Sequence, residues 1–249
     1  MEYVFEGIFR WLHVFFGILW IGLLYFFNWV NSAFAPTMDA DTKRKVVPEL
    51  MPRALYWFRW GAAFTWVTGV LLLLIVYYHQ QALFEGSAHW SVATIVMIAL
   101  VFVAPFIYDA LYKGPLKDPT TGFIAGLVLA LVVLLLFAYW AHFSFRGYAI
   151  HLGAMFGTIM AFNVWFRIWP SQQTIITATK NGQAPDPAIV ALAGTRSKHN
   201  TYMSVPLVFT MVGQHETWAA NPIYLTIIVL VGWGLVYHIY DRAKNVKGF

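Results

Sequence analysis

The sequence of 249 residues contains no cysteine. Disulfide bonds, thiolate metal sites, iron–sulfur clusters and covalently attached c-type haem are therefore excluded for this chain. A Gly-rich phosphate loop, a His-Glu-x-x-His zinc motif and the nucleophile elbow of serine hydrolases are also missing. Redox chemistry on this chain would have to use histidine, methionine, aromatic residues or a bound cofactor.

Charged residues are scarce, and long apolar segments take their place. Charged residues make up 11% of the chain and hydrophobic residues 60%, and the mean hydropathy is +0.63. Most of the apolar segments approach the roughly 20 residues that a helix needs to cross a bilayer. The segments lie at 8–30, 58–78, 91–108, 122–141, 148–168, 202–216 and 222–240.

These segments predict an all-α integral membrane protein, because membrane barrels are built from strands with alternating polarity instead. We expect a bundle of about seven transmembrane helices that forms a single membrane domain over residues 1–249. The lipid bilayer is thus the first expected partner. The predicted cytoplasmic connectors are 32–57, which contains three prolines and is expected to include a surface helix, and 169–200. Asp186 is expected to cap a helix that has Pro187 in its first turn and runs from Ala188 into the sixth span.

The basic residues predict an orientation. Of the 16 Lys and Arg residues, only Arg10 and Arg146 fall on one side of the alternating segments. Because positive flanks remain in the cytoplasm, the N-terminus is expected outside and the C-terminus inside the inner (cytoplasmic) membrane. The net charge of +5 is therefore a topological signal, and no nucleic-acid partner is expected. We also expect no cleavable signal peptide, since the first apolar run is too long.

Histidines near the outer ends of three spans are the strongest chemical signal. His13 lies in the first span, His151 in the fifth, and His215 at the outer end of the sixth. An ionisable residue inside a span is costly and usually faces the bundle interior. Two neutral imidazoles at matched depth can ligate the iron of a low-spin b-type haem. His13 and His151 are therefore the predicted haem ligands, and His215 is either a replacement candidate or an interfacial histidine.

Three glycines accompany these histidines. Gly17 is about one helical turn from His13, and Gly153 and Gly157 form a small face beside His151. Their missing side chains would leave space for a porphyrin. The same glycines would equally suit tight helix packing.

A second polar group is predicted at the inner ends of the spans. Asn163 and Arg167 are four residues apart and share a helix face, Arg59 opens the second span and His199 enters the sixth. Together they could bind haem propionates, a quinone head or an anionic heterocycle. Alternatively, arginines at span ends extend towards water, and Asp109 pairs with one of them.

Four stretches of this sequence resemble the membrane-bound urate oxidase family, also called urate hydroxylase. They are RWLHVFFGILWIGLLYFFNWVNSAFAP (10–36), ALYWFRWGAAFTWVTG (54–69), HLGAMFGTIMAFNVWFRIWPSQ (151–172) and SKHNTYMSVPLVFTMV (197–212). The resemblance implies oxidation of urate to 5-hydroxyisourate in purine degradation, with electrons passed to a cytochrome c that follows the membrane domain in full members. This sequence reaches Phe249 without a Cys-x-x-Cys-His motif. A separate c-type cytochrome or oxidoreductase subunit is therefore the expected partner.

Three functions remain open from the sequence. The first is a membrane redox subunit that carries haem b near the periplasmic face. The second is a urate-oxidising enzyme in its own right, in which the inner polar group binds the purine. The third is a non-catalytic membrane anchor or assembly subunit.

Overall fold

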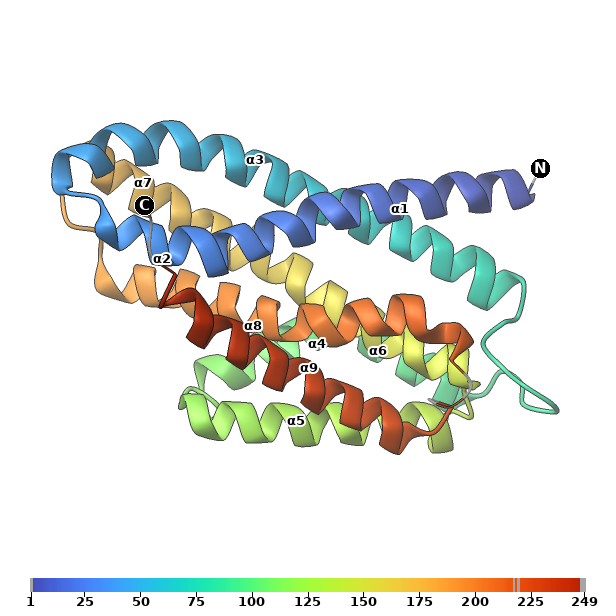
Figure 1. Ribbon diagram of the computed structural model, residues 1–249. Helices are drawn as coiled ribbons and strands as arrows, with labels where there is room; N and C mark the ends of the chain where they lie inside the picture. Colours follow the sequence, from blue (N-terminus) through green and yellow to red (C-terminus); the bar gives the residue numbers. More distant parts are fainter. Residues whose placement is uncertain (1, 217, 219, 247–249) are drawn as a thin grey trace.

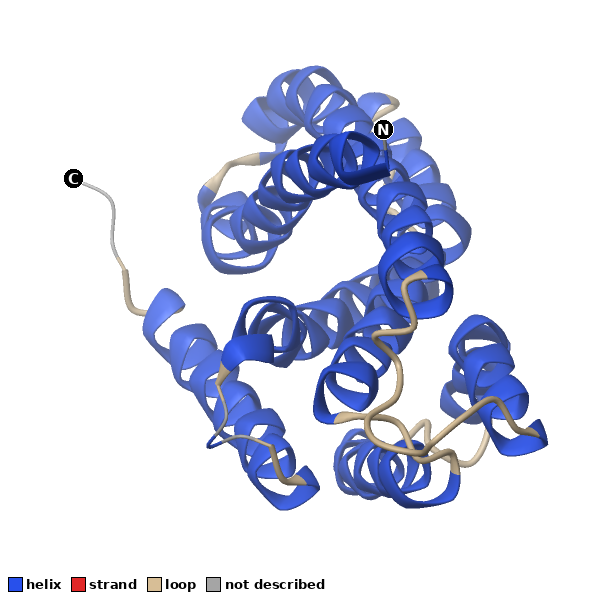
Figure 2. Ribbon diagram, turned by 90° about the vertical axis from the view of Figure 1, so that its right-hand side faces the viewer, coloured by secondary structure: helices blue, strands red, loops and turns tan. Residues whose placement is uncertain are grey.

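The computed structural model describes residues 2–216, 218 and 220–246, and this part of the chain is helical without any strand (Figures 1 and 2). The α-helices are α1 (Glu2–Tyr25), α2 (Ser32–Phe34), α3 (Ala40–Leu72), α4 (Val92–Lys113), α5 (Pro119–Leu135), α6 (Phe145–Asn163), α7 (Trp169–Lys180), α8 (Pro187–Val212) and α9 (Pro222–Ala243). Wider π-helical or tighter 3₁₀ turns continue several of them: η1 (Phe26–Asn31), η2 (Ala35–Thr37), η3 (Leu73–His79), η4 (Leu136–Trp140), η5 (Val164–Ile168) and η6 (Gly213–His215).

Six of the longer helices begin at a side-chain cap. In α4, the hydroxyl group of Ser91 accepts a hydrogen bond from the backbone N–H of Thr94 at 3.2 Å. Such caps satisfy N–H groups that have no partner inside the helix. In α8, the predicted cap is confirmed, because Asp186 accepts from the N–H of Ala188 and Pro187 occupies the first turn. The capping residues are Asp39, Ser91, Asp118, Ser144, Asp186 and Asn221.

Six helical segments in the described part are long and apolar enough to cross a membrane. They are Tyr3–Thr37, Ala40–His79, Val92–Lys113, Pro119–Trp140, Phe145–Lys180 and Pro222–Ala243. Each coincides with one of the seven apolar segments of the sequence. The remaining segment, 202–216, lies mainly in α8, a helix whose first half carries Arg196, Lys198 and His199. These polar side chains keep α8 out of the group of six, although it is long enough.

The predicted connector 32–57 is mostly helical. The helix expected there is longer than a surface helix, because α3 begins at Ala40 and continues without a break through Pro48 and Pro52 into the second span. The second connector is also mostly helical, because α7 extends η5 to Lys180 and α8 starts at Pro187. As predicted, one helix leads from residue 188 into the sixth segment.

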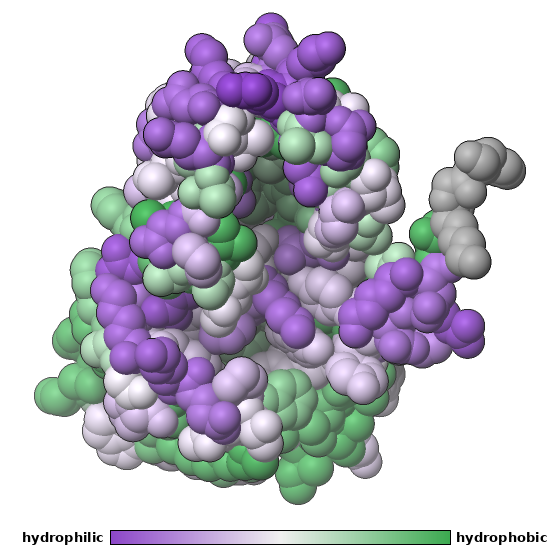
Figure 3. All heavy atoms as spheres, turned by 90° about the vertical axis from the view of Figure 1, so that its left-hand side faces the viewer, coloured by the Kyte–Doolittle hydropathy of each residue, from purple (hydrophilic) through white to green (hydrophobic). Residues whose placement is uncertain are grey.

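The segment that contains α6 forms the centre of the bundle. Among the most apolar 18 residues of Phe145–Lys180, 72% are buried, compared with 11–39% in the other five segments. The N- and C-terminal ends of the chain lie at opposite ends of the bundle (Figure 1). Hydrophilic side chains gather at the end that holds α7 and the start of α3 (Figure 3). This is the end predicted to face the cytoplasm.

The outward faces of the helices are apolar. Ile18, Val92 and Phe106 are 70%, 78% and 65% exposed, and many other large hydrophobic side chains share this exposure. A soluble monomer rarely exposes contiguous apolar surface on this scale. The surface therefore suits a lipid environment, in agreement with the six apolar segments.

Candidate functional site

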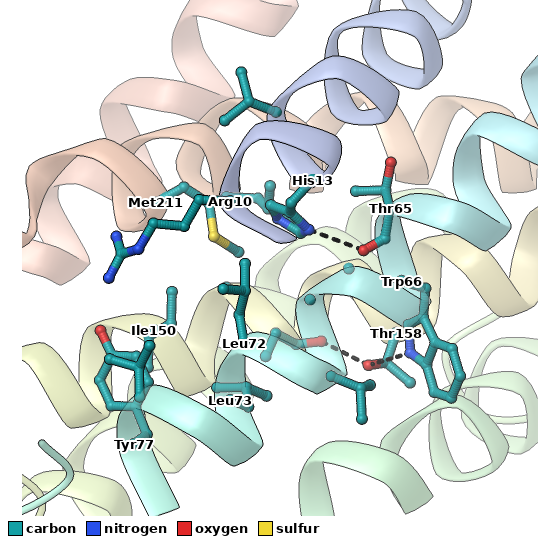
Figure 4. A pocket seen from close by; sticks show the side chains of 18 of the residues that line it. Arg10, His13, Thr65, Trp66, Leu72, Leu73, Tyr77, Ile150, Thr158 and Met211 are labelled. Atoms are coloured by element: carbon teal, nitrogen blue, oxygen red, sulfur yellow. Dashed lines mark hydrogen bonds between the residues drawn. The ribbon is translucent and has the colours of Figure 1, made fainter. Parts of the chain in front are cut away.

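A cavity of about 310 Å³ lies between α1, α3, α6 and α8, towards the N-terminal end of α1 (Figure 4). Most of its lining is apolar or aromatic, including Trp66, Leu207 and Met211. A few polar groups interrupt this lining, among them His13 and Arg10 from α1. A concave apolar space with a few convergent polar groups is typical of a cofactor or ligand site.

The imidazole of His13 is oriented by the backbone of α3. Its Nδ1 lies 2.9 Å from the carbonyl oxygen of Thr65 and 3.2 Å from the hydroxyl oxygen of Thr68 (Figure 4). Because a carbonyl only accepts hydrogen bonds, Nδ1 carries the proton and Nε2 keeps its lone pair. Within the described residues, nothing hydrogen-bonds to Nε2 of His13. Histidines that ligate metals are commonly held in this way by a carbonyl group on the other nitrogen.

Gly69 makes room for the His13 ring. A Cβ atom at Gly69 would lie 2.9 Å from Cε1 of His13, closer than such atoms approach in proteins. A glycine is thus required where α3 crosses the imidazole. Sequence reasoning missed Gly69 and Thr65, although pairing the first two spans in antiparallel order would have brought this part of α3 near His13.

His151 is buried but does not line the cavity. Its Nδ1 donates to the carbonyl oxygen of Gly147 at 2.7 Å, and its Nε2 accepts from the Tyr78 hydroxyl at 3.0 Å. The rings of Tyr77 and Phe143 also pack near the imidazole, whose side chain is completely enclosed. Both ring nitrogens are therefore occupied by protein groups, and the structure does not bring His151 together with His13.

The other residues of the predicted haem site lie in different surroundings. His215 is exposed in η6 and does not line the cavity. Gly17 faces Thr65, whose Cγ2 atom would be 3.9 Å from an added Cβ. Gly153 and Gly157 do line the cavity, and α8 also packs closely on them. Close helix packing is therefore observed at both glycines, and space for a porphyrin stays a prediction.

At the opposite end of the bundle, Asp109 of α4 is the centre of an ion-pair network. Arg167 binds it in a bidentate manner, with Nε–Oδ1 and Nη2–Oδ2 distances of 2.8 and 2.5 Å. Arg196 of α8 donates from Nη2 to Oδ1 at 2.9 Å, and Lys113 lies 2.8 Å from Oδ2. Arg196 is only 2% exposed. Three cations thus surround one carboxylate, and Asp109 joins three helical segments.

Two more of the predicted inner residues extend this network through Tyr108. The Tyr108 hydroxyl lies 2.7 Å from Nδ1 of His199, and Asn163 donates to the same hydroxyl at 3.3 Å. Asn163 also donates to Asn200 at 2.9 Å. Arg196 joins these groups to the ion pairs, because its Cζ lies 4.8 Å from the centroid of the Tyr108 ring. Three of the four predicted residues, Asn163, Arg167 and His199, are therefore connected.

Arg59 is not part of this network. Its guanidinium stacks on the ring of Trp169, with Cζ 3.9 Å from the ring centroid. Sequence analysis also left Tyr108 and Arg196 out of the group. A lone acidic residue at the inner end of a span, Asp109, was the available signal, because a carboxylate at that depth requires cationic partners.

In its described part, the chain is an all-helical protein with membrane-type helices and a mainly apolar cavity that His13 lines. The chain belongs to the family described as urate oxidase N-terminal, whose model matches residues 38–247. The match begins after α1, so His13 and Arg10 lie outside it. No curated protein and no solved structure matches the chain.

Proposed function

We propose that this chain is the membrane component of an oxidoreductase of the urate oxidase family and binds haem b in the cavity through His13. The supporting observation is the His13 imidazole, which has its Nδ1 held by the Thr65 carbonyl and its Nε2 without a protein partner. Bound haem would supply one-electron transfer. The expected electron acceptor is a c-type cytochrome or an oxidoreductase subunit, and the expected location is the inner membrane.

The lining of the cavity offers two features that support a haem. The space is mainly apolar, with Gly69, Gly153 and Gly157 among its lining residues, and His13 would supply one neutral nitrogen ligand. Met211 and Tyr77 also line the cavity and carry side chains of types that ligate haem iron in proteins. His151 could act as the second ligand only after giving up its hydrogen bond to the Tyr78 hydroxyl and moving towards the cavity.

The visible spectrum of the purified protein tests this proposal. We expect a haem Soret band in the wild-type protein, its loss in His13→Ala and its retention in His151→Asn. The His151 variant is the control, because that imidazole is a second inward-facing histidine of a membrane-type helix but lies outside the cavity lining. Loss of the band in both folded variants would instead support the bis-histidine haem. A wild-type protein without haem, or a His13 variant with unchanged haem, would contradict the proposal.

Oxidation of urate by this chain is the second candidate. Family membership favours it, and the inner network contains two buried polar atoms, Asn163 Oδ1 and Arg196 Nη1, without a hydrogen-bond partner in the described part of the chain. Such atoms are costly unless a ligand or water satisfies them. Urate-dependent reduction of added cytochrome c by the purified chain would support this function. A protein with neither haem nor turnover would be a membrane anchor or assembly subunit.

A further inference from the structure

Arg10 and Arg146, the two basic residues that the sequence separates from all the others, both lie near Tyr77 at one side of the cavity. Arg10 lines the cavity from α1, whereas Arg146 lies in the first turn of α6 and is not itself among the lining residues. Both guanidinium groups are close enough to interact electrostatically with the hydroxyl group of Tyr77, which also lines the cavity. Figure 4 shows the Arg10 guanidinium on the same side of the cavity as this hydroxyl. We call Arg10, Arg146 and Tyr77 the basic corner.

The basic corner has more positive than negative charge. Arg10 pairs with Glu6 at 2.7 Å, and Glu6 also accepts a hydrogen bond from Gln80. In the described part of the chain, no ion pair includes Arg146, and its Nε is buried without a hydrogen-bond partner. Of the two guanidinium groups, only that of Arg10 is therefore paired with a carboxylate in the described part of the chain. Such a deficit of negative charge next to an apolar cavity favours an anionic ligand.

The position of the corner indicates what kind of anion would bind there. The cavity is lined mainly by apolar side chains, which suit the flat ring of a ligand, whereas the corner offers charge at its edge. The Arg10 side chain is 55% exposed, so this edge is open to solvent. A ligand with an apolar ring and carboxylates on one edge would place the ring against the apolar lining and the carboxylates at the basic corner. Arginine binds carboxylates through charge-assisted and often bidentate hydrogen bonds.

We infer that Arg10 and Arg146 bind the propionate carboxylates of a haem whose ring occupies the cavity. This inference rests on the proposed function. It reverses the sequence interpretation, which considered propionates at the inner polar group. There, Arg167 is already occupied by Asp109 in a bidentate pair.

A titration with two haems tests the inference. The full-length chain, freed of haem in detergent, is titrated with haemin and with haemin dimethyl ester, whose propionates carry no charge. We expect Arg10→Gln and Arg146→Gln each to weaken haemin binding about ten-fold, the lower end of the range for charged hydrogen bonds because the corner is partly exposed. Binding of the ester should be the same in wild type and variants, which also shows that the variants are folded.

Arg53→Gln is the matched control. Arg53 forms an i,i+4 pair with Glu49, as Arg10 does with Glu6, but it lies in the first half of α3 and does not line the cavity. The Arg53→Gln variant should bind haemin with the same affinity as the wild type. The reduction potential gives a second measurement: it should fall in both corner variants, because removal of a nearby positive charge favours the ferric form.

The outcomes separate this inference from the proposed function. If the wild type binds neither haemin nor its ester, the proposed function is wrong and the inference falls with it. If the wild type binds haemin and both corner variants bind it equally well, only the inference is wrong. Equal loss of haemin and ester in the variants would also overturn it, since the arginines would then support the cavity and not the carboxylates.

Discussion

The orientation of His13 depends on three neighbouring positions of a different helix. The Thr65 carbonyl fixes the protonated nitrogen, Thr68 provides a second oxygen, and Gly69 leaves the space that the ring occupies. The imidazole is therefore pre-oriented before any ligand binds. Sites with such support hold their geometry better than sites on mobile side chains.

Replacement of Gly69 should disturb the orientation of His13 without removing the imidazole itself. In Gly69→Ala the new methyl group would overlap the His13 ring, so the imidazole must move, and we expect a loss of stability of about 1–3 kcal/mol. Haem affinity should fall as well. Gly22→Ala is the control, because nothing lies within 4 Å of the added Cβ atom. Thermal unfolding and the Soret band, measured on both variants, check this. Unchanged haem binding in Gly69→Ala would show that the His13 orientation is unimportant.

Individual residues show how far sequence reasoning reaches at this scale. The cost of an ionisable group in a span was enough to identify His13 as an inward-facing side chain, and it does line the cavity. The same reasoning applied to His151, which is fully buried, but there Tyr78 and Gly147 occupy the ring nitrogens. Depth can be predicted from position along a span. The partners of a side chain depend on helix rotation and register, which one sequence does not specify.

Among the helices, α4, α8 and η5 are connected by the buried carboxylate of Asp109. Arg196 comes from α8, Arg167 from η5, and Lys113 lies one turn further along α4. A carboxylate shared by cations from different helices determines how those helices are positioned along one another. The network therefore stabilises the end of the bundle opposite the cavity, where α7 and α8 extend beyond the apolar segments.

Neutralising Asp109 should strongly destabilise the bundle. In Asp109→Asn, Arg196 keeps its charge but loses its counter-ion in a nearly inaccessible position, and breaking a buried pair in this way costs about 3–5 kcal/mol. Glu49→Gln removes the partner of Arg53 in an exposed pair and should cost at most about 1 kcal/mol. Denaturant unfolding of both variants in the same detergent gives the comparison. Equal stability of the two variants would mean that the Asp109 network contributes little.

The extent of the helices shows another limit of sequence analysis. Apolar runs located each membrane-type helix, and the cap at Asp186 was recognised from its proline neighbour. However, the fifth apolar run ends near residue 168, whereas helix continues through α7 to Lys180. Hydropathy records where a helix contacts lipid, but hydrogen bonding along the backbone continues into polar sequence. The polar first half of α8 also lies beyond its apolar run, and there the cap at Asp186 predicted the helix that hydropathy alone would have missed.

Across the whole molecule, the two ends differ in charge and in architecture. One end holds the cavity and only two arginines, and the other holds the Asp109 network and most of the basic residues. Since basic flanks remain in the cytoplasm, the cavity would open towards the outer side of the membrane. A carrier outside the membrane could then approach a haem in the cavity directly. The orientation therefore decides whether the proposed route of electrons is feasible.

Single cysteines can determine this orientation, because the chain has none of its own. Ser87 lies exposed in the loop between η3 and α4, on the side of the cavity, and Lys180 lies exposed at the end of α7. In intact cells, Ser87→Cys should react with a membrane-impermeant thiol reagent and Lys180→Cys should react only after the membrane is permeabilised. Reaction of Lys180→Cys alone would reverse the orientation. The cavity would then face the cytoplasm, and its electrons would have to reach an acceptor there instead of a periplasmic cytochrome.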